Sequence, residues 1–165
     1  ADRRGILLVR GPNVFSGYYC FDGPSPFHEI DGSQWYVTGD LARVDAEGFI
    51  HIEGRKRRFL KAGGEMISLP ALEQPLSSRY PPIAAGPRVA VEGFESETGR
   101  CVVLFTTESI TLREANALLQ EEGFRGVMRF DEVCRIEQIP LLGTGKTNYR
   151  ALRAQISEGA AAGTS

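Results

Sequence analysis

Short apolar runs separated by glycine, aspartate and proline dominate the first third of the chain. The runs cover residues 5–10, 35–38, 41–44 and 48–53. They are rich in Val, Ile, Leu and aromatic residues and are bounded by turn formers, which is typical of β-strands. Residues 45–48 (Asp-Ala-Glu-Gly) fit a hairpin turn. Residues 22–33, with two prolines and two glycines, are expected to form a loop.

Helix signals begin after residue 54. Ser68 followed by Pro70 predicts the start of a helix, which Pro75 should keep short or kinked. Thr111 and Glu114 form a capping box that opens an amphipathic helix. This helix should reach about Glu122, with an apolar stripe of Leu112, Ala115, Leu118 and Leu119.

Buried strands and a last helix complete the second part of the chain. Apolar runs predict strands at residues 89–91, 101–107 and 132–138, with residues 92–99 connecting the first two. The final helix is expected at 149–156, with Leu152 and Ile156 on one face. The tail 158–165, rich in Ala and Gly, is expected to be frayed or disordered. No internal repeat is visible.

Together these elements predict two pieces of α+β class. Residues 1–53 would form a β-rich piece, the end of a larger domain. Residues 58–157 would form a small domain with a short antiparallel sheet and flanking helices. Between them, residues 54–57 form a charged junction, where a hinge is expected because few contacts need to break there.

Composition is that of a soluble globular chain. Of 165 residues, 42% are hydrophobic and 24% charged, with a formal net charge of −2, which favours neither disorder nor general nucleic-acid affinity. Five of the seven residues 55–61 are nevertheless basic. No apolar run approaches the roughly 20 residues that span a bilayer. The chain starts without Met and directly before a strand, so we expect a piece of a longer protein.

The cysteines and histidines give no metal motif. Cys20, Cys101 and Cys134 are odd in number and widely separated, which predicts buried thiols in a reducing compartment. His28 and His51 have no paired Cys or carboxylate motif and are assigned no role. We therefore predict no metal site.

Residues 140–150 place Lys146 on a loop with Gly143 and Gly145, a geometry that presents a cation to a phosphate. A Walker A loop would need a glycine where Pro140 stands, and too few residues follow for the rest of a nucleotide triphosphatase. A solvated turn whose lysine has no role is the remaining alternative.

Three motifs in sequence resemble the C-terminal motifs of the adenylate-forming enzymes, a superfamily of acyl-CoA synthetases, nonribosomal peptide adenylation domains and firefly luciferase. They are Tyr36-Val-Thr-Gly-Asp40, then Gly54-Arg55 with Lys61, Gly64 and Glu73, then Pro140 with Gly145-Lys146. The amino-acid sequences of residues 54–68, 103–107 and 140–146 are most similar to those of bacterial acyl-[acyl carrier protein] synthetases joined to 2-acylglycerophosphoethanolamine acyltransferases.

The narrower resemblance implies a parent enzyme that uses ATP and Mg²⁺ to load a fatty acid onto acyl carrier protein and then passes it to a lysophospholipid. This enzyme would act at the cytoplasmic side of the bacterial inner membrane. Coenzyme A is the alternative acceptor, because both acceptors present a pantetheine thiol. The phosphate loop and most of the acyl pocket would lie in the enzyme's N-terminal adenylation domain, so we expect this chain alone to be inactive.

The resemblance assigns the first half-reaction to four residues. Asp40 would accept hydrogen bonds from the ribose hydroxyls of ATP, with Arg55 and Tyr36 also on the nucleotide. Lys146 would stabilise the negative charge that develops as the carboxylate displaces pyrophosphate.

The second half-reaction is assigned to a different face. Rotation about Arg57 would bring Lys61, Gly63, Gly64 and Glu65 to the active site, where the glycines leave room for a pantetheine arm. The family usually has Asp or Lys at the position of Arg57, whereas this chain has Arg57-Arg58. We predict that Lys56 and Arg58 join Arg57 in steering an acidic carrier protein.

A module without chemistry is the competing interpretation. Such a module would dock RNA, anionic lipid or carrier protein through the basic junction. The acidic net charge, and the lack of aromatic residues in the basic run apart from Phe59, argue against nucleic acid.

Overall fold

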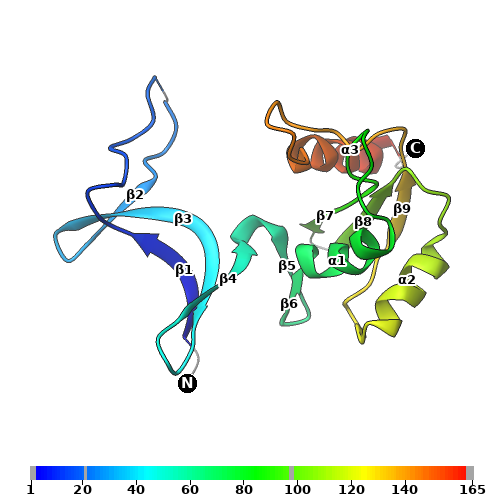
Figure 1. The fold of residues 1–165 in the computed structure, drawn as a ribbon, viewed down its shortest axis with the longest axis horizontal. Helices are drawn as coiled ribbons and strands as arrows, with labels where there is room; N and C mark the ends of the chain where they lie inside the picture. Colours follow the sequence, from blue (N-terminus) through cyan, green and yellow to red (C-terminus); the bar gives the residue numbers. More distant parts are fainter. Residues whose placement is uncertain (1–2, 21, 97–98, 163–165) are drawn as a thin grey trace. The chain divides into compact units, whose positions relative to one another are not determined.

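The computed structural model describes residues 3–20, 22–96 and 99–162. The chain divides into two compact units, residues 1–57 and residues 58–165. The first unit contains strands and loops but no α-helix among the described residues, whereas the second contains both strands and α-helices (Figure 1). The α+β class predicted from the sequence is confirmed.

The first unit is an antiparallel sheet built around one long strand. Strand β3 (Ser33–Val44) pairs with β1 (Arg3–Val9), β2 (Phe27–Ile30) and β4 (Ile50–Arg55). The runs expected as separate strands at 35–38 and 41–44 are thus one strand of 12 residues. Gly39, with φ of +75°, lies between the two runs and lets the strand continue through an irregular point.

Strand β2 corrects the expectation that residues 22–33 form a loop. Ile30 pairs with Ser33, which leaves Asp31 and Gly32 as a two-residue hairpin turn. Both have positive φ, +50° and +69°, as the tight turns that match strand twist require. The prolines that favoured a loop precede the strand, so they remove no hydrogen bond from it.

The predicted turn at 45–48 is confirmed. The Asp45 carboxylate accepts hydrogen bonds from the backbone N–H of Glu47 at 3.0 Å and of Phe49 at 2.9 Å. His51 Nε2 lies 2.6 Å from Asp45 Oδ2, and this hydrogen bond is the main cause of a lowered pKa for the Asp45 carboxyl. His51 therefore supports the turn.

The second unit contains a three-stranded sheet in the order β7 (Val89–Ser96), β8 (Gly99–Thr106) and β9 (Glu132–Arg135). Strands β7 and β8 are antiparallel, but β8 and β9 are parallel, so the predicted antiparallel sheet is mixed. Helix α2 (Leu112–Glu121) lies in the crossover between the parallel pair. A separate hairpin is formed by β5 (Phe59–Ala62) and β6 (Glu65–Ser68).

The predicted helix starts are confirmed. Helix α1 (Leu69–Arg79) begins at Ser68, whose hydroxyl accepts from the N–H of Ala71 at 3.3 Å. The capping box is present, since Thr111 accepts from the N–H of Glu114 at 3.3 Å and donates its own N–H to the Glu114 carboxylate at 2.8 Å. Leu112, however, is 37% exposed and does not join the buried stripe.

Helix α1 continues past Pro75, which was expected to keep it short or kinked. The helix runs on to Arg79. Its neighbours Leu72 and Leu76 are fully buried in the core. Burial of these side chains offsets the hydrogen bond that proline removes.

Several boundaries of the second unit differ from the pattern-based expectation. Strand β7 extends through Ser96, because residues 92–96, expected as a connection, pair with β8. Strand β9 ends at Arg135, short of 138. Helix α3 (Tyr149–Ala162) continues through residues 158–162 of the tail expected to be frayed, and residues 163–165 lie outside the described ranges.

Alternate residues of β7 and β8 point into two cores on opposite faces of the sheet. One core holds Val91 and Leu104 with the buried leucines of α1 and α2. The other holds Phe105 with Leu152 of α3. On β7, a Cβ at Gly93 would lie 2.9 Å from Leu60 Cδ1, so the absence of a side chain there lets β5 pack closely on the sheet.

The cysteines are free thiols, but they are not all buried as predicted. Cys20 is exposed, whereas Cys101 and Cys134 are half-buried. Burial raises the pKa of both half-buried thiols. Among the residues described, no group of three or more His, Cys, Asp or Glu side chains could hold a metal ion. Nor is any described helix both long and apolar enough to cross a membrane.

Candidate functional site

Asp40 and Arg55 face each other in the first unit because β3 and β4 pair in that register. Arg55 Nε lies 3.0 Å from Asp40 Oδ1, and the same guanidinium donates to the backbone carbonyl of Thr38. The Asp40 side chain is 24% exposed and that of Arg55 is 55% exposed. The pair therefore presents a carboxylate and a planar donor to a ligand.

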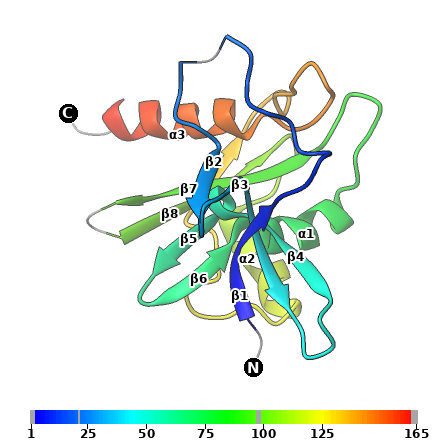
Figure 2. The ribbon, with the colours of Figure 1, turned by 90° about the vertical axis from the view of Figure 1, so that its left-hand side faces the viewer.

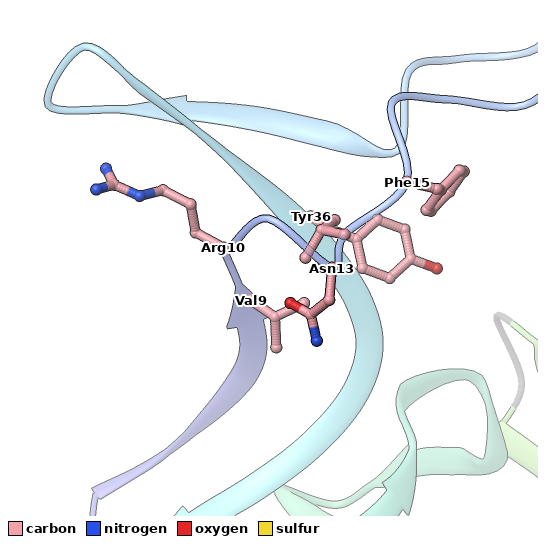
Figure 3. Close-up of a pocket in the computed structure, with 6 residues that line it drawn as sticks. Val9, Arg10, Asn13, Phe15 and Tyr36 are labelled. Carbon is pink, nitrogen blue, oxygen red and sulfur yellow. The ribbon is translucent and has the colours of Figure 1, made fainter.

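Tyr36 lies on the same strand, beside a surface pocket of about 560 Å³ that Val9, Arg10, Asn13, Val14 and Phe15 also line. Its ring centroid is 5.2 Å from that of Phe15. Figure 3 shows Arg10 extending away from the Tyr36 ring.

The pKa of Tyr36 is raised, first by a hydrogen bond with Tyr18 and then by burial. The charge of Arg55 lowers this pKa and that of Asp40 raises it. The structure thus brings together the three residues assigned to the nucleotide.

Lys146 closes a tight loop in the second unit. Its carbonyl accepts the N–H of Leu142 at 2.8 Å, and Gly145 N–H donates to Leu142 O at 2.8 Å. Gly145 has φ of +80°, a value that favours glycine. At the base of the loop, Asn148 N–H donates to Pro140 O at 2.7 Å. The Lys146 side chain is exposed and forms no ion pair with any residue that the structure describes.

The β5–β6 hairpin presents a second candidate element. Ala62 pairs with Glu65, so Gly63 and Gly64 form its two-residue turn, with φ of +58° and +85°. A Cβ at either glycine would meet nothing within 4 Å, so the turn borders open space. Lys61 and Glu65 have exposed side chains on either side of it. The Lys61 N–H donates to Glu95 on β7, which helps to hold the hairpin on the sheet.

The structure does not bring these two elements together. Figures 1 and 2 show the loop around Lys146 and the β5–β6 hairpin at opposite ends of the second unit. Lys146 and the double-glycine turn therefore belong to separate faces.

The basic residues at the junction differ in their surroundings. Lys56 and Arg57, in a short 3₁₀ turn (Lys56–Arg58), have exposed side chains. Arg58 is turned inward, with its side chain only 13% exposed. It donates to Glu73 Oε2 at 3.0 Å and to the carbonyl of Val91 at 2.9 Å. Arg58 is therefore committed to an internal ion pair, which removes it from the predicted carrier-protein docking surface.

Tyr149 is a residue of this region that sequence reasoning missed. Its hydroxyl donates to Glu73 Oε1 at 2.7 Å, and the Arg58 guanidinium carbon lies 3.6 Å from the centre of its ring. Burial, followed by the negative charge of Glu73, raises the pKa of Tyr149 to about 12. The local sequence around Tyr149 indicates only that the last helix starts there. The contact joins positions 76 residues apart, which no periodicity reveals.

The raised pKa of Tyr149 predicts a stability change at alkaline pH. The folded protein favours the neutral phenol, so this contribution is complete below the ordinary pKa of 10 and is lost as pH rises toward about 12. Urea unfolding should show the stability advantage of the wild type over Tyr149→Phe shrinking from pH 9 to about pH 12. A constant difference over this range would contradict the assigned environment.

The chain matches curated ligases along nearly its whole length, although a search of family models found no match. It is 30% identical over 161 residues to enterobactin synthase component E of Escherichia coli. This match covers 96% of this chain and 29% of that protein. It is 33% identical over 162 residues to 2,3-dihydroxybenzoate-AMP ligase of Bacillus subtilis, covering 96% and 29%. For the medium-chain fatty-acid–CoA ligase of Escherichia coli, identity is 33% over 156 residues, covering 92% and 27%.

Solved structures show the same fold. ATP-bound MatB from Rhodopseudomonas palustris has a TM-score of 0.71 at 22% identity, covering 93% of this chain and 30% of that one. The o-succinylbenzoate CoA synthetase of Bacillus subtilis in complex with its acyl-adenylate intermediate has a TM-score of 0.69 at 24% identity, covering 92% and 30%.

The comparisons agree with the superfamily that the three motifs resemble. The chain spans about 29% of the length of the curated relatives it matches first. Their names include both aryl-acid and fatty-acid ligases, so they do not single out the narrower likeness to acyl carrier protein synthetases joined to acyltransferases. The homologues of this chain are adenylate-forming ligases of acyl and aryl acids.

Proposed function

We propose that this chain works as part of an ATP-dependent acid–thiol ligase and supplies a different face to each of two half-reactions. The observation that supports this proposal most is the separation of two elements in the second unit. The loop around Lys146 lies at one end of this unit, and the β5–β6 hairpin with its double-glycine turn lies at the other (Figures 1 and 2). Homology to ligases supports the same chemistry.

In the first half-reaction, the carboxylate of the acid attacks the α-phosphorus of ATP and pyrophosphate leaves. Negative charge gathers on the oxygens around this phosphorus, and the ammonium of Lys146 stabilises it. The backbone hydrogen bonds of the loop fix where the Lys146 side chain begins, which lowers the entropy cost of placing its charge.

Asp40, Arg55 and Tyr36 would hold the nucleoside in this step. Arg55 engages Asp40 Oδ1, and the carboxylate retains lone pairs that can accept from ribose hydroxyls. Tyr36 lines the adjacent pocket. The Mg²⁺ that accompanies ATP would be held mainly by the phosphates and by the N-terminal adenylation domain that the resemblance implies.

In the second half-reaction, a pantetheine thiol attacks the acyl-adenylate carbonyl and AMP leaves. The open space at Gly63 and Gly64 suits a narrow pantetheine arm, with the charges of Lys61 and Glu65 on either side. A rotation at Arg57 would exchange the two faces of the second unit. The separation of those faces makes such a rotation necessary if both serve one active site.

The acid and the acceptor are the finer part of the proposal. We propose that the acid substrate is a fatty acid and that the thiol acceptor is an acyl carrier protein. This proposal is based on the amino-acid sequence of residues 54–68 and on the exposed cations of Lys56 and Arg57. Carrier proteins are acidic, so these cations would raise their association rate. Coenzyme A is the alternative acceptor. Transfer to a lysophospholipid stays a prediction of the narrower resemblance.

The experiment that tests this function measures both half-reactions in the longer protein proposed to contain this chain. Wild type should exchange labelled pyrophosphate into ATP only when a carboxylic acid substrate is present. Lys61→Ala should keep that exchange and slow loading of the thiol acceptor by about tenfold, since a cation near the arm speeds encounter. Arg113→Ala, which removes an exposed cation from α2, is the matched control.

Two results would contradict the proposal. A wild-type protein that exchanges no pyrophosphate with any of a panel of fatty and aryl acids lacks the first half-reaction. Equal loading rates for wild type and Lys61→Ala would remove Lys61 from the thioester face. Comparing carrier protein with coenzyme A in the same assay identifies the acceptor.

A further inference from the structure

The carboxylate of Glu73 joins three distant segments of the second unit. Its Oε2 accepts from Arg58 at 3.0 Å and from the backbone N–H of Val91 at 2.7 Å, while Oε1 accepts from the Tyr149 hydroxyl at 2.7 Å. The Arg58 and Glu73 side chains are only 13% and 17% exposed. At this burial, hydrogen bonds to a charged group fix geometry strongly.

One of these segments leads directly to Lys146. Tyr149 lies three residues after that lysine and is the first residue of α3. Between the two, Asn148 donates its N–H to Pro140 O at 2.7 Å, and its side chain accepts from the N–H of Ala151 at 3.1 Å. The base of the Lys146 loop is therefore held on the same carboxylate through Tyr149.

A second segment leads to the junction. Arg58 is the first residue of the second unit and directly follows Arg57. Its guanidinium stacks on the Tyr149 ring. This stacking contact joins the junction end of the second unit to the tyrosine at the base of the Lys146 loop.

We propose that Glu73, Tyr149 and Arg58 form a positioning cluster for Lys146. This inference rests on the proposed function. The cluster fixes the Lys146 loop relative to the first residue of the second unit, so that rotation at Arg57 delivers the ammonium to one defined place. Tyr149 acts through Lys146 and touches no substrate itself. A displacement of about 1 Å in such a group lowers a rate by up to about a hundredfold.

Tyr149→Phe tests the cluster because it removes only the hydroxyl and keeps the ring under Arg58. We expect kcat for pyrophosphate exchange to fall about tenfold with KM for ATP unchanged. The reaction of preformed acyl-adenylate with the thiol acceptor should keep its wild-type rate. Tyr80→Phe is the matched control, since Tyr80 is also half-buried in this unit and stacks near arginine side chains.

A double variant separates positioning from general destabilisation. If Tyr149 acts through Lys146, adding Tyr149→Phe to Lys146→Ala should leave the residual exchange rate unchanged. A further tenfold loss in the double variant, an equal fall in both half-reactions, or an unchanged kcat in Tyr149→Phe alone would each overturn the inference. Absence of exchange in the wild type would instead refute the proposed function, so the two failures are distinguishable.

Discussion

Lys146→Ala is expected to lower the rate of acid-dependent pyrophosphate exchange by about a hundred- to a thousandfold. The ammonium stabilises charge that develops only in the transition state, and removal of one such group typically costs roughly 3 to 4 kcal/mol of barrier. Because the interaction is absent in the ground state, the loss should fall on kcat more than on KM for ATP. Quench-flow measurement of acyl-adenylate formation gives the rate of this step directly.

The position of the loop sharpens this prediction. The loop around Lys146 and the β5–β6 hairpin lie at opposite ends of the second unit (Figures 1 and 2), so the variant should react preformed acyl-adenylate with a thiol at close to the wild-type rate. Arg150→Ala removes another exposed cation four residues away and should change neither half-reaction. If Lys146→Ala exchanged pyrophosphate normally, the loop would be a simple turn and the chemistry would have to lie elsewhere.

Glu73→Leu is expected to destabilise the second unit by roughly 3 to 5 kcal/mol. The substitution leaves the Arg58 guanidinium buried without its anion, and breaking a buried ion pair by removing one partner has a cost of this order. It also removes the acceptor for Val91 N–H and for the Tyr149 hydroxyl. Urea unfolding followed by far-ultraviolet circular dichroism reports this loss, because every α-helix in the described ranges lies in the second unit.

Two comparison variants make the stability measurement decisive. Glu73→Gln keeps the shape and an acceptor oxygen, so it should lose less stability than Glu73→Leu and remain folded. Glu108→Leu breaks the ion pair between Glu108 and Arg88, whose side chains are 25% and 26% exposed. Its effect on the free energy of unfolding should be much smaller. Equal losses in Glu73→Leu and Glu108→Leu would show that burial of the Arg58 pair adds nothing.

The sequence predicted those features that depend only on residues close together in the chain. The caps at Ser68 and Thr111, the turn at Asp45 and the exposed loop of Lys146 each depend on residues within a few positions of one another. These features could be predicted because turn and cap chemistry is encoded by short segments.

Contacts between distant residues could not be predicted in this way. The parallel pairing of β8 with β9 and the inward turn of Arg58 depend on where the chain folds back. Arg58 lies within a basic run that predicts a solvated surface, and its partner is 15 residues away. The continuation of α1 past Pro75 has a similar cause, since burial of Leu72 and Leu76 offsets a local penalty.

The unequal burial of the three thiols provides a way to watch the first unit in solution. Thiolates are the species that react with maleimides, and the raised pKa values of Cys101 and Cys134 keep their thiolate fraction small at neutral pH. Cys20 is exposed and belongs to the first unit. A maleimide fluorophore added at neutral pH is therefore directed to Cys20 without any change of sequence. Energy transfer to it from Trp35, the single tryptophan of this chain and in the same unit, provides an internal reference for the labelled protein.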